Sequence, residues 1–365
     1  MKILHVINSL NTGGAEKLVL DTVPLYNKKG ITVDVLVFDG FEYPFYKELR
    51  EKYCCRIISL KAKSVYNPFL IFQIIPYLKK YDIIHVHLFP AQYWVVLAKI
   101  LTFSKVKLLF TEHSTTNRRL NNRVFKYLDR IIYWFYANVV CISSEIQRII
   151  NKHVFYSKDK TVLICNGVVT DNYIKAKPYL KTDLGFKEIK NTSKILIQVA
   201  GFREEKDQST LIKAMPYLPE NVCLFLVGDG PFKSKCEQLA VDLGVNKRIY
   251  FLGVRLDVPQ LLKTADIVIL SSKYEGLSLS SIEGMASGNP FVASNVPGLN
   301  TVVDGAGILF PLGDALKLAN IINELVKNNV LYNATSKACI ERAKRYDINI
   351  MVEKHIELYK NVYNN

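Results

Sequence analysis

Short apolar runs alternate with longer stretches of helical spacing along most of this 365-residue chain. In the first half, the apolar runs fall at residues 3–8, 32–38, 55–60, 83–87, 107–111 and 139–142. Helical patterns lie between them, near residues 15–28, 45–52, 68–80, 91–102 and 121–136. Such alternation predicts parallel strands joined by right-handed crossover helices that cover both faces of a sheet. We therefore predict a protein of the α/β class.

The same order begins again after residues 175–194. This segment carries Pro178, Gly185 and six lysines and has little periodicity, so we predict an interdomain linker. Six more strands are predicted at residues 195–200, 223–227, 249–252, 267–270, 291–293 and 308–310. We expect two doubly wound, Rossmann-like domains, residues 1–174 and 195–347, which bind ligands at the carboxyl ends of both sheets and hence in a cleft.

The composition is that of a globular protein with room for two domains, since 49% of the residues are hydrophobic. No apolar run approaches the ~18 residues of a membrane span, and the first strand is too short for the apolar core of a signal peptide. The seven cysteines are scattered, and their spacing fits neither a zinc site nor a disulfide framework. We therefore expect a reduced, cytoplasmic protein.

The net charge of +15 is distributed unevenly along the chain. Residues 1–170 hold 24 Lys and Arg against 12 Asp and Glu. Five basic residues gather beside the aromatic run at 133–136: Arg118, Arg119, Arg123, Lys126 and Arg130. Such a segment favours an acidic partner, either the anionic inner face of a membrane or a nucleic acid, but it is also typical of a solvated helix face.

Two glutamates, Glu275 and Glu283, lie eight residues apart where a strand is predicted to lead into a helix. Gly276 and three serines stand between them, so only the second glutamate is expected well inside the helix. The backbone amides of an uncapped helix start form an anion site. The pattern fits a phosphate with one carboxylate on either side. It fits equally a solvated acid followed by an ordinary helical glutamate.

The turn after the first strand contains Gly13 and Gly14, directly before a predicted helix. Glycine lets the backbone approach a ligand closely, and the helix amides favour an anion. The segment is not the G-x-G-x-x-G fingerprint of dinucleotide-binding folds, so it gives little support to NAD binding. A plain tight turn explains it as well.

Histidines occur in and after two successive predicted strands of the first half. His85 and His87 point to the same side of one strand, because side chains repeat every two residues. Zinc is conceivable there, but no further ligand has a suggestive spacing, and packing or hydrogen bonding is the favoured interpretation. His113 follows the next strand, at the carboxyl edge, where it can donate to a sugar hydroxyl or accept a backbone hydrogen bond.

Arg203 and Lys206 follow the first strand of the second predicted domain. Their charges are candidates for stabilising a diphosphate, the leaving group when a sugar departs from its nucleotide. The chain has no two aspartates in D-x-D spacing, the usual sign of a metal-bound nucleotide sugar. We therefore expect neither a metal nor another cofactor. Surface charges at a strand end are the simpler alternative.

Together these segments resemble the family 4 glycosyltransferases of the GT-B fold. The most specific match is the Glu-x(7)-Glu element, Glu275 and Glu283, in its strand–loop–helix setting. Further matches follow the family's order along the chain, at residues 13–16, 82–87, 111–114, 166–168, 228–231 and Gly253. The resemblance covers the whole chain. It implies two domains that face each other across a cleft, with a final helix, about residues 348–365, returning to the first domain.

The resemblance also implies a retaining transfer of a sugar from a nucleotide donor, without a bound metal. It assigns the ribose hydroxyls to Glu283, the donor sugar to Glu275 and the diphosphate to Lys206. Phosphate would be received by backbone amides of the segment Gly276, Leu277, Ser278 and Leu279.

In the resemblance, the remaining donor contacts come from other loops. Gly14, with Gly13 beside it, approaches the phosphates from the first domain. His113 lies near the donor sugar, and the backbone at Val254 contacts the base. Arg203 joins Lys206 in assisting departure of the diphosphate.

Three positions depart from the family pattern. Gly201 stands where an arginine is usual, and Arg203, two residues on, is the candidate substitute. Thr301 lies near the place of a common glutamate, and Ile31 replaces a frequent histidine. None of these changes touches the paired glutamates or Lys206, so we expect activity.

The expected function is therefore transfer of a sugar from a UDP-sugar, with a GDP-sugar as the alternative. The expected acceptor is a saccharide or lipid-linked oligosaccharide in the synthesis of a surface polysaccharide. A nucleotide-sugar epimerase of related fold is a rival, because it would act on the same donor. A basic nucleic-acid-binding module is a more remote rival, since no recognised nucleic-acid motif accompanies the charge.

Overall fold

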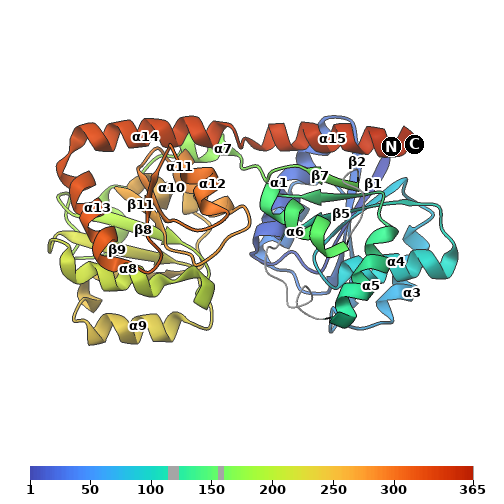
Figure 1. The fold of residues 1–365 in the computed structure, drawn as a ribbon, viewed down its shortest axis with the longest axis horizontal. Helices are drawn as coiled ribbons and strands as arrows, with labels where there is room; N and C mark the ends of the chain where they lie inside the picture. Colours follow the sequence, from blue (N-terminus) through green and yellow to red (C-terminus); the bar gives the residue numbers. More distant parts are fainter. Residues whose placement is uncertain (114–122, 155–159, 365) are drawn as a thin grey trace. The chain divides into compact units, whose positions relative to one another are not determined.

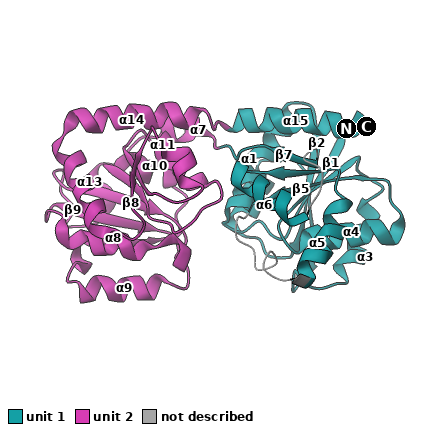
Figure 2. Cartoon of the chain, in the orientation of Figure 1, with its two compact units in different colours: residues 1–167, 348–365 teal, residues 168–347 magenta. Residues whose placement is uncertain are grey.

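The computed structural model describes residues 1–113, 123–154 and 160–364. They form two compact units, shown in different colours in Figure 2. Unit 1 comprises Met1–Gly167 and Ile348–Asn365, and unit 2 comprises Val168–Asp347. Each unit has its own parallel sheet with helices packed around it (Figure 1). The predicted α/β class with two Rossmann-like domains is confirmed.

In the described part of unit 1, seven parallel strands pair in the order β3-β2-β1-β4-β5-β6-β7. The strands are β1 (Lys2–Ile7), β2 (Thr32–Asp39), β3 (Ile57–Ala62), β4 (Ile83–His87), β5 (Lys107–Glu112), β6 (Asn138–Cys141) and β7 (Thr161–Leu163). The helices are α1 (Gly14–Lys28), α2 (Pro44–Glu51), α3 (Leu70–Ile74), α4 (Ala91–Thr102), α5 (Arg123–Trp134), α6 (Ser144–Val154) and α15 (Ile348–Asn364). The order of strands reverses between β1 and β4, which is where an open α/β sheet binds ligands.

Unit 2 repeats this plan with six parallel strands in the order β10-β9-β8-β11-β12-β13. The strands are β8 (Lys194–Val199), β9 (Val222–Val227), β10 (Ile249–Gly253), β11 (Ile267–Leu270), β12 (Phe291–Ser294) and β13 (Ile308–Phe310). The helices are α7 (Thr170–Ile174), α8 (Gln208–Ala214), α9 (Lys233–Asp242), α10 (Val258–Thr264), α11 (Leu279–Ala286), α12 (Leu299–Val303), α13 (Ala315–Lys327) and α14 (Asn329–Lys344). Here the order reverses between β8 and β11.

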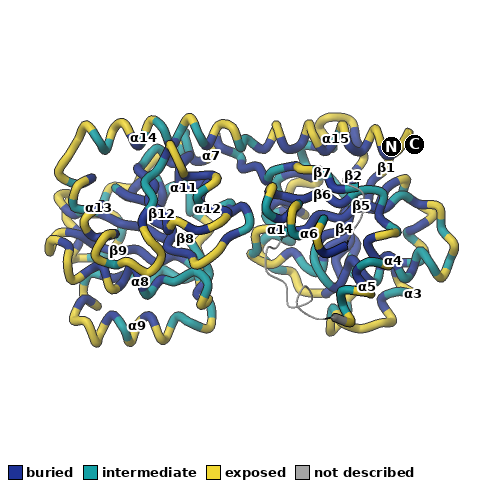
Figure 3. The backbone as a smooth tube through the Cα atoms, in the orientation of Figure 1, coloured by how far each residue is buried: buried dark blue, intermediate teal, exposed yellow. Residues whose placement is uncertain are grey.

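The central strands of both units are buried along their whole length. Every residue of β4, β9, β11 and β12 is buried, as the dark blue segments of Figure 3 illustrate. Near-continuous apolar strands are typical of parallel sheets, because helices cover both faces. The loops at the carboxyl ends of these strands are the sites where polar residues meet.

The segment predicted as a linker, residues 175–194, is part of unit 2 instead. The Tyr179 amide donates to the Thr264 hydroxyl at 2.8 Å, and the Lys181 amino group lies 2.7 Å from an Asp266 carboxylate oxygen. Lys181 of this segment therefore pairs with the carboxylate that directly precedes β11. The chain crosses between the units at Gly167–Val168 and again at Asp347–Ile348.

The final helix returns to unit 1, as predicted. It is α15, which begins at Ile348 and packs against α1. Its inward face carries His355 and Tyr359, both buried. The helix therefore brings polar aromatic side chains from the end of the chain into the interior of unit 1.

Candidate active site

The candidate site of unit 2 is built around a partly buried ion pair. The Lys206 amino group lies 2.6 Å from a carboxylate oxygen of Glu275, and the Ser272 hydroxyl donates to the same oxygen at 2.7 Å. Lys206 ends the 3₁₀ helix η5 (Glu204–Lys206), which follows β8, and Glu275 follows β11. Because the strand order reverses between β8 and β11, these two loops meet at the switch point of the sheet.

Polar side chains beneath the ion pair hold the Lys206 loop in place. The Gln198 side-chain amide donates to the Lys206 carbonyl at 3.0 Å, and the buried Ser271 hydroxyl donates to the Asp207 carbonyl at 2.8 Å. The Lys273 amide donates to the Glu205 carbonyl at 2.8 Å and so ties the two loops together. The position of the Lys206 side chain is therefore set by backbone contacts as well as by its charge.

The helix α11 carries the second glutamate. It begins at Leu279 with Ser278 as N-cap, and no side chain makes the capping hydrogen bond. Glu283 lies within the helix and is buried. A Cβ on Gly284 would meet side-chain atoms of Phe291 at 2.7 Å, so glycine allows α11 to lie close to the sheet. The predicted helix start, with one glutamate in the loop and one inside the helix, is what the structure contains.

A glycine in the loop after β12 supports Glu275 from the other side. Gly298 has φ +84°, a conformation that favours glycine. A Cβ at Gly298 would lie 2.2 Å from the Glu275 carbonyl oxygen and 2.6 Å from that of Gly276. Only a residue without a side chain permits this close approach, so Gly298 is part of the scaffold that positions Glu275.

Two predicted residues of unit 2 do not join the cluster. The Arg203 side chain is 70% exposed and approaches Glu205 only at 4.0 Å. Val254 directly follows β10 and is exposed. Gly276, Leu277 and Ser278 lie in the loop between Glu275 and α11. The structure thus brings Lys206 and Glu275 into contact and leaves the roles of Arg203 and Val254 as predictions.

In unit 1, the predicted glycine turn lies at the carboxyl end of β1. Gly14 begins α1, and Gly13 is its N-cap in an extended conformation, without a side-chain capping hydrogen bond. Gly14 is exposed, so its backbone is accessible. A Cβ added at Gly13 would lie 2.2 Å from Glu16 Oε2, so a carboxylate of the chain itself lies against this turn, and phosphate contact at Gly13 and Gly14 stays a prediction.

His113 directly follows β5 and is the outermost member of a histidine cluster. His87 lies 3.2 Å from it between ring nitrogens, and His5 lies 3.0 Å from His87. Both ring nitrogens of His85 are bonded as well, to the hydroxyls of Tyr359 and Thr111 at 2.7 Å each. His85 and His87 are therefore packed and hydrogen-bonded in the interior of the unit.

These imidazoles are kept neutral by their surroundings. Burial, aided by the nearby His355, lowers the pKa of His5 to about 3 and the pKa of His113 to about 4. Burial, followed by the repulsion of neighbouring histidines, lowers the pKa of His85 and that of His87 well below the ordinary value. At neutral pH the cluster carries no charge, in contrast to the ion pair of unit 2.

Three of the histidines come close enough to suggest a metal site. Ligand atoms of His5, His85 and His87 lie within 4.8 Å of one another. Both ring nitrogens of each, however, already bond protein groups, since His5 also contacts the Tyr359 hydroxyl at 3.2 Å. A metal ion would have to replace several of these bonds.

The predicted basic segment falls partly outside the described residues, which include neither Arg118 nor Arg119. Where it is described, α5 has a buried side anchored by Asp129, which bonds Tyr93 and, at 2.8 Å, His153. Its exposed side is apolar, with a row at helical spacing: Val124, Tyr127, Leu128, Ile131 and Trp134. No helix in the described part of the chain has both the length and the apolar character needed to cross a membrane.

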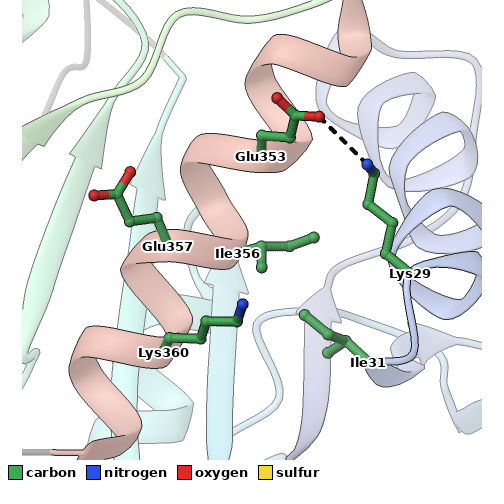
Figure 4. Close-up of a pocket in the computed structure, with 6 residues that line it drawn as sticks. All are labelled: Lys29, Ile31, Glu353, Ile356, Glu357 and Lys360. Atoms are coloured by element: carbon green, nitrogen blue, oxygen red, sulfur yellow. Dashed lines mark hydrogen bonds and ion pairs between the residues drawn. The ribbon is translucent and has the colours of Figure 1, made fainter.

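A surface pocket of about 530 Å³ lies elsewhere in unit 1, between α15 and the turn that joins α1 to β2 (Figure 4). The Lys29 amino group there points towards Glu353 at a distance of 3.4 Å, and both side chains are largely exposed. Ile31, Ile356, Glu357 and Lys360 complete the lining. None of the predicted site residues lines this pocket, so it is separate from the candidate site.

Two family sequence models match the chain in succession. The model described as Glycosyltransferase Family 4 matches residues 12–172, and the model described as Glycosyl transferases group 1 matches residues 181–346. The chain belongs to the family 4 glycosyltransferases. The resemblance drawn from the Glu-x(7)-Glu element and the order of the motifs is thereby confirmed.

This glycosyltransferase has curated relatives of similar length. It is 27% identical over 320 residues to the UDP-Gal:alpha-D-GlcNAc-diphosphoundecaprenol alpha-1,3-galactosyltransferase of Escherichia coli, with 84% of this chain and 81% of the relative covered. It is also 27% identical over 292 residues to the N-acetyl-alpha-D-glucosaminyl L-malate synthase of Bacillus anthracis, with 77% and 74% covered.

Solved structures confirm the GT-B fold of the glycosyltransferase. Anabaena HepE, in complex with UDP and glucose, matches 99% of this chain and 100% of its own with a TM-score of 0.85 at 23% identity. The sucrose-phosphate synthase from Thermosynechococcus elongatus matches 100% of this chain and 99% of its own, with a TM-score of 0.81 at 21% identity.

Several residues that hold the site of this glycosyltransferase are not predicted from its sequence. Ser272 and Gln198 are polar residues in or after strands that are otherwise apolar, and that pattern was the available signal. His5 offered the same signal in β1. Tyr359 and Gly298 gave none, because each acts through contacts distant in sequence.

Proposed function

We propose that this protein is a retaining glycosyltransferase that moves a sugar from a UDP-sugar to a lipid-linked saccharide, without a bound metal ion. The observation that carries the proposal is the Lys206–Glu275 ion pair at the switch point of unit 2. Glu275 stands in the loop that leads to the uncapped start of α11, and that helix carries the buried Glu283. Anion-binding groups and carboxylates are thus combined within one unit.

The chemistry requires stabilisation of negative charge on the departing diphosphate. Lys206 and the amides from Gly276 to Leu279 supply fixed positive charge and partial charge for this purpose. This arrangement takes the role that a metal ion has in enzymes with a D-x-D pair, and the chain has no such pair. In the proposal, Glu283 binds the ribose hydroxyls and Glu275 accepts hydrogen bonds from the donor sugar.

Retention follows from a reaction on one face of the sugar. The bond from the anomeric carbon to the diphosphate oxygen breaks, and the acceptor oxygen bonds to that carbon from the same side. The acceptor proton passes to the departing phosphate oxygen. This route is proposed because the sequence gives no pair of carboxylates placed to flank the anomeric carbon, as a double displacement requires.

Other predicted residues complete the donor site in this proposal. His113 lies near the donor sugar, and Gly13 and Gly14 approach the phosphates through their backbone. Arg203 assists Lys206, and the backbone at Val254 contacts the base. The choice of UDP is supported by the names of relatives, one a UDP-Gal-dependent transferase and one solved with UDP and glucose.

A transfer assay tests this proposal. UDP- and GDP-sugars are offered with a polyprenyl-diphosphate saccharide, with and without EDTA, and the anomeric configuration of the product is read by NMR. Glu275→Ala should lower kcat/KM by about 10²–10³-fold while UDP still raises the Tm. Glu237→Ala, which removes an exposed carboxylate of the same unit, is the matched control.

The same assay separates the rival functions. Conversion of the sugar nucleotide without an acceptor would support an epimerase. Activity that EDTA abolishes would contradict metal independence, and an inverted product would contradict retention. A Glu275→Ala variant as active as the wild type would remove the assigned role of the ion pair.

We further propose that unit 1 contacts the anionic inner face of the cell membrane. A lipid-linked acceptor of a surface polysaccharide would be found there. The support is the exposed apolar row of α5 together with basic residues, since Lys126 and Arg130 lie on the same helix. Lys160 lies over the Trp134 ring at 4.9 Å. Apolar side chains contribute by burial, and each basic residue adds about 1 kcal/mol near an anionic surface.

Flotation with phosphatidylglycerol vesicles tests the membrane contact. The wild type should float at low salt and lose most of its binding at high salt. Ile131→Ser combined with Trp134→Ser should abolish flotation, whereas Val330→Ser, at an exposed apolar position of unit 2, should not. A wild type that stays unbound at low salt would remove the proposal.

A further inference from the structure

Six side chains of unit 1 form one continuous line of hydrogen bonds. His113 Nε2 lies 3.2 Å from His87 Nδ1, and His87 Nε2 lies 3.0 Å from His5 Nδ1. His5 Nε2 lies 3.2 Å from the Tyr359 hydroxyl, which lies 2.7 Å from His85 Nδ1. The line ends where His85 Nε2 lies 2.7 Å from the Thr111 hydroxyl. It therefore joins the carboxyl end of β5 to the last helix.

Neutral histidines restrict how the protons in this line can be placed. A neutral imidazole carries one N–H and one lone pair, so it donates one hydrogen bond and accepts one. His5, His85 and His87 each use both nitrogens, and burial lowers the pKa of all three, which keeps them neutral at pH 7. Each must therefore accept from one neighbour and donate to the other. The bonds from Tyr359 through His5 and His87 to His113 must then all point in the same direction along the line.

Tyr359 differs from the histidines, because its oxygen donates one hydrogen bond but can accept two. It can therefore donate to His5, or accept from His5 while its proton goes to another partner. In the first case His5, His87 and His113 carry their proton on Nδ1, and in the second they carry it on Nε2. The hydroxyl of Tyr359 therefore sets one common tautomer for these three histidines, which His85 need not share.

We propose that this line contains a tautomer relay, in which the hydroxyl of Tyr359 on the C-terminal helix sets the tautomers of His5, His87 and His113 together. Tyr359 is in this sense a positioning residue. The direction of its O–H bond decides whether the outer nitrogen of His113, Nδ1, donates or accepts a hydrogen bond. The relevance of this choice for catalysis rests on the proposed function, which places His113 near the donor sugar.

The groups around the relay are compatible with both arrangements. The Tyr26 hydroxyl hydrogen-bonds Tyr359, whose oxygen can accept more than one bond. His355 lies beside the line, with its ring centroid 5.6 Å from that of His85, and burial lowers its pKa to about 4. No carboxylate is among the groups that shift the pKa of His5, His85 or His87. The relay is therefore a chain of neutral groups.

Nitrogen NMR of histidine tautomers tests the relay directly. The wild type, labelled with ¹⁵N-histidine, should have His5, His87 and His113 in one common tautomer. In Tyr359→Phe, the nitrogens that faced the hydroxyl should keep lone pairs, because a buried N–H without an acceptor is the costlier loss. His85 should then carry its proton on Nε2, while His5, His87 and His113 carry theirs on Nδ1.

Two references make this experiment decisive. His153, which bonds Asp129 outside the relay, should be unchanged in every variant. Tyr136→Phe removes another buried hydroxyl of the same unit, one that donates to the Gln92 carbonyl, and should leave all four tautomers as in the wild type. Mixed tautomers among His5, His87 and His113 in the wild type, or a proton on His5 Nε2 in Tyr359→Phe, would overturn the relay.

Turnover is a separate readout. A variant in which the tautomer of His113 changes should lose kcat by about 10²-fold, and a variant in which it is unchanged should keep it. If the tautomers follow the relay and turnover does not follow His113, the relay stands and the proposed role of His113 fails.

Discussion

The two units stabilise buried polar side chains in opposite ways. Unit 2 places a charged pair, Lys206 and Glu275, at the switch point of its sheet. Unit 1 places neutral histidines at the equivalent edge and holds all six histidines of the chain. Both arrangements are held by hydrogen bonds, but only the first carries permanent charge.

This difference suggests a division of roles in the proposed reaction. A fixed charge suits a ligand whose charge is also fixed, such as a diphosphate, because no reorganisation is needed when it binds. Neutral imidazoles suit hydroxyl groups, since each can donate or accept at little cost. In the proposed reaction, the charged pair of unit 2 therefore suits the diphosphate of the donor, and the histidines of unit 1 suit hydroxyl groups of the sugar.

Removing the charge of Lys206 from unit 2 should have the largest effect on catalytic activity. Lys206→Ala should lower kcat/KM by about 10²–10³-fold, because the departing diphosphate loses its main cation. Lys273→Ala is the control, since that amino group is partly exposed and pairs with Glu204 at 3.2 Å. Steady-state kinetics of both variants measures the contrast, and equal losses would show that net charge, rather than the position of Lys206, matters.

Acid should act on unit 1 before unit 2. The pKa of His5 is lowered to about 3, and those of His113 and His355 to about 4, mainly by burial. Below pH 6.5 the unfolded chain binds protons that the folded unit does not, so stability is fully present above that pH and falls as pH decreases towards 4. The three residues together should cost about 3 kcal/mol between pH 6.5 and 5.5.

Tryptophan fluorescence can follow this loss, because Trp94 and Trp134 both lie in unit 1. The urea midpoint of the fluorescence change should fall between pH 7 and pH 5.5. Hydrogen exchange of peptides from residues 168–347, corrected for the intrinsic rates, should change much less. Parallel losses in both units would contradict the assignment of acid sensitivity to the histidines.

The bounds of strands and helices were predicted correctly where a local sequence pattern defines them. The structure reproduces the predicted bounds of β4 and β11, because continuous apolar runs define them. The helix predicted at residues 68–80 is instead α3 followed by a short 3₁₀ turn, since Pro76 lacks a backbone N–H. The strand β7, only three residues long, was not predicted.

The candidate site was predictable only in part. Glu275, Glu283 and Lys206 were identified because they lie in short motifs at strand ends. The histidine line was not, because it depends on strand register: His5 of β1 lies opposite His85 of β4 in the sheet. Such pairing is a property of the folded sheet, and no local pattern encodes it.

Gly298, which lies against the Glu275 loop of unit 2, should contribute to the stability of that unit. Gly298→Ala should destabilise unit 2 by about 2 kcal/mol or more, because its Cβ would clash with the Glu275 carbonyl. Gly313→Ala is the matched control: its φ is also positive, +76°, but nothing lies within 4 Å of the added Cβ. That variant should show only the backbone strain, about 1 kcal/mol. Urea unfolding of both variants, with circular dichroism as the signal, separates the clash from the strain.

The smallest effect is expected at Arg203, and it tests whether the charge of unit 2 acts through position. Its side chain is 70% exposed and reaches Glu205 only at 4.0 Å, so water screens it in the absence of a donor. Arg203→Ala should therefore lower kcat/KM less than about fivefold, in contrast to Lys206→Ala. A loss as large as that of Lys206→Ala would mean that Arg203 swings onto the diphosphate when the donor binds. Arg203 would then fill the place that Gly201 leaves in the family pattern.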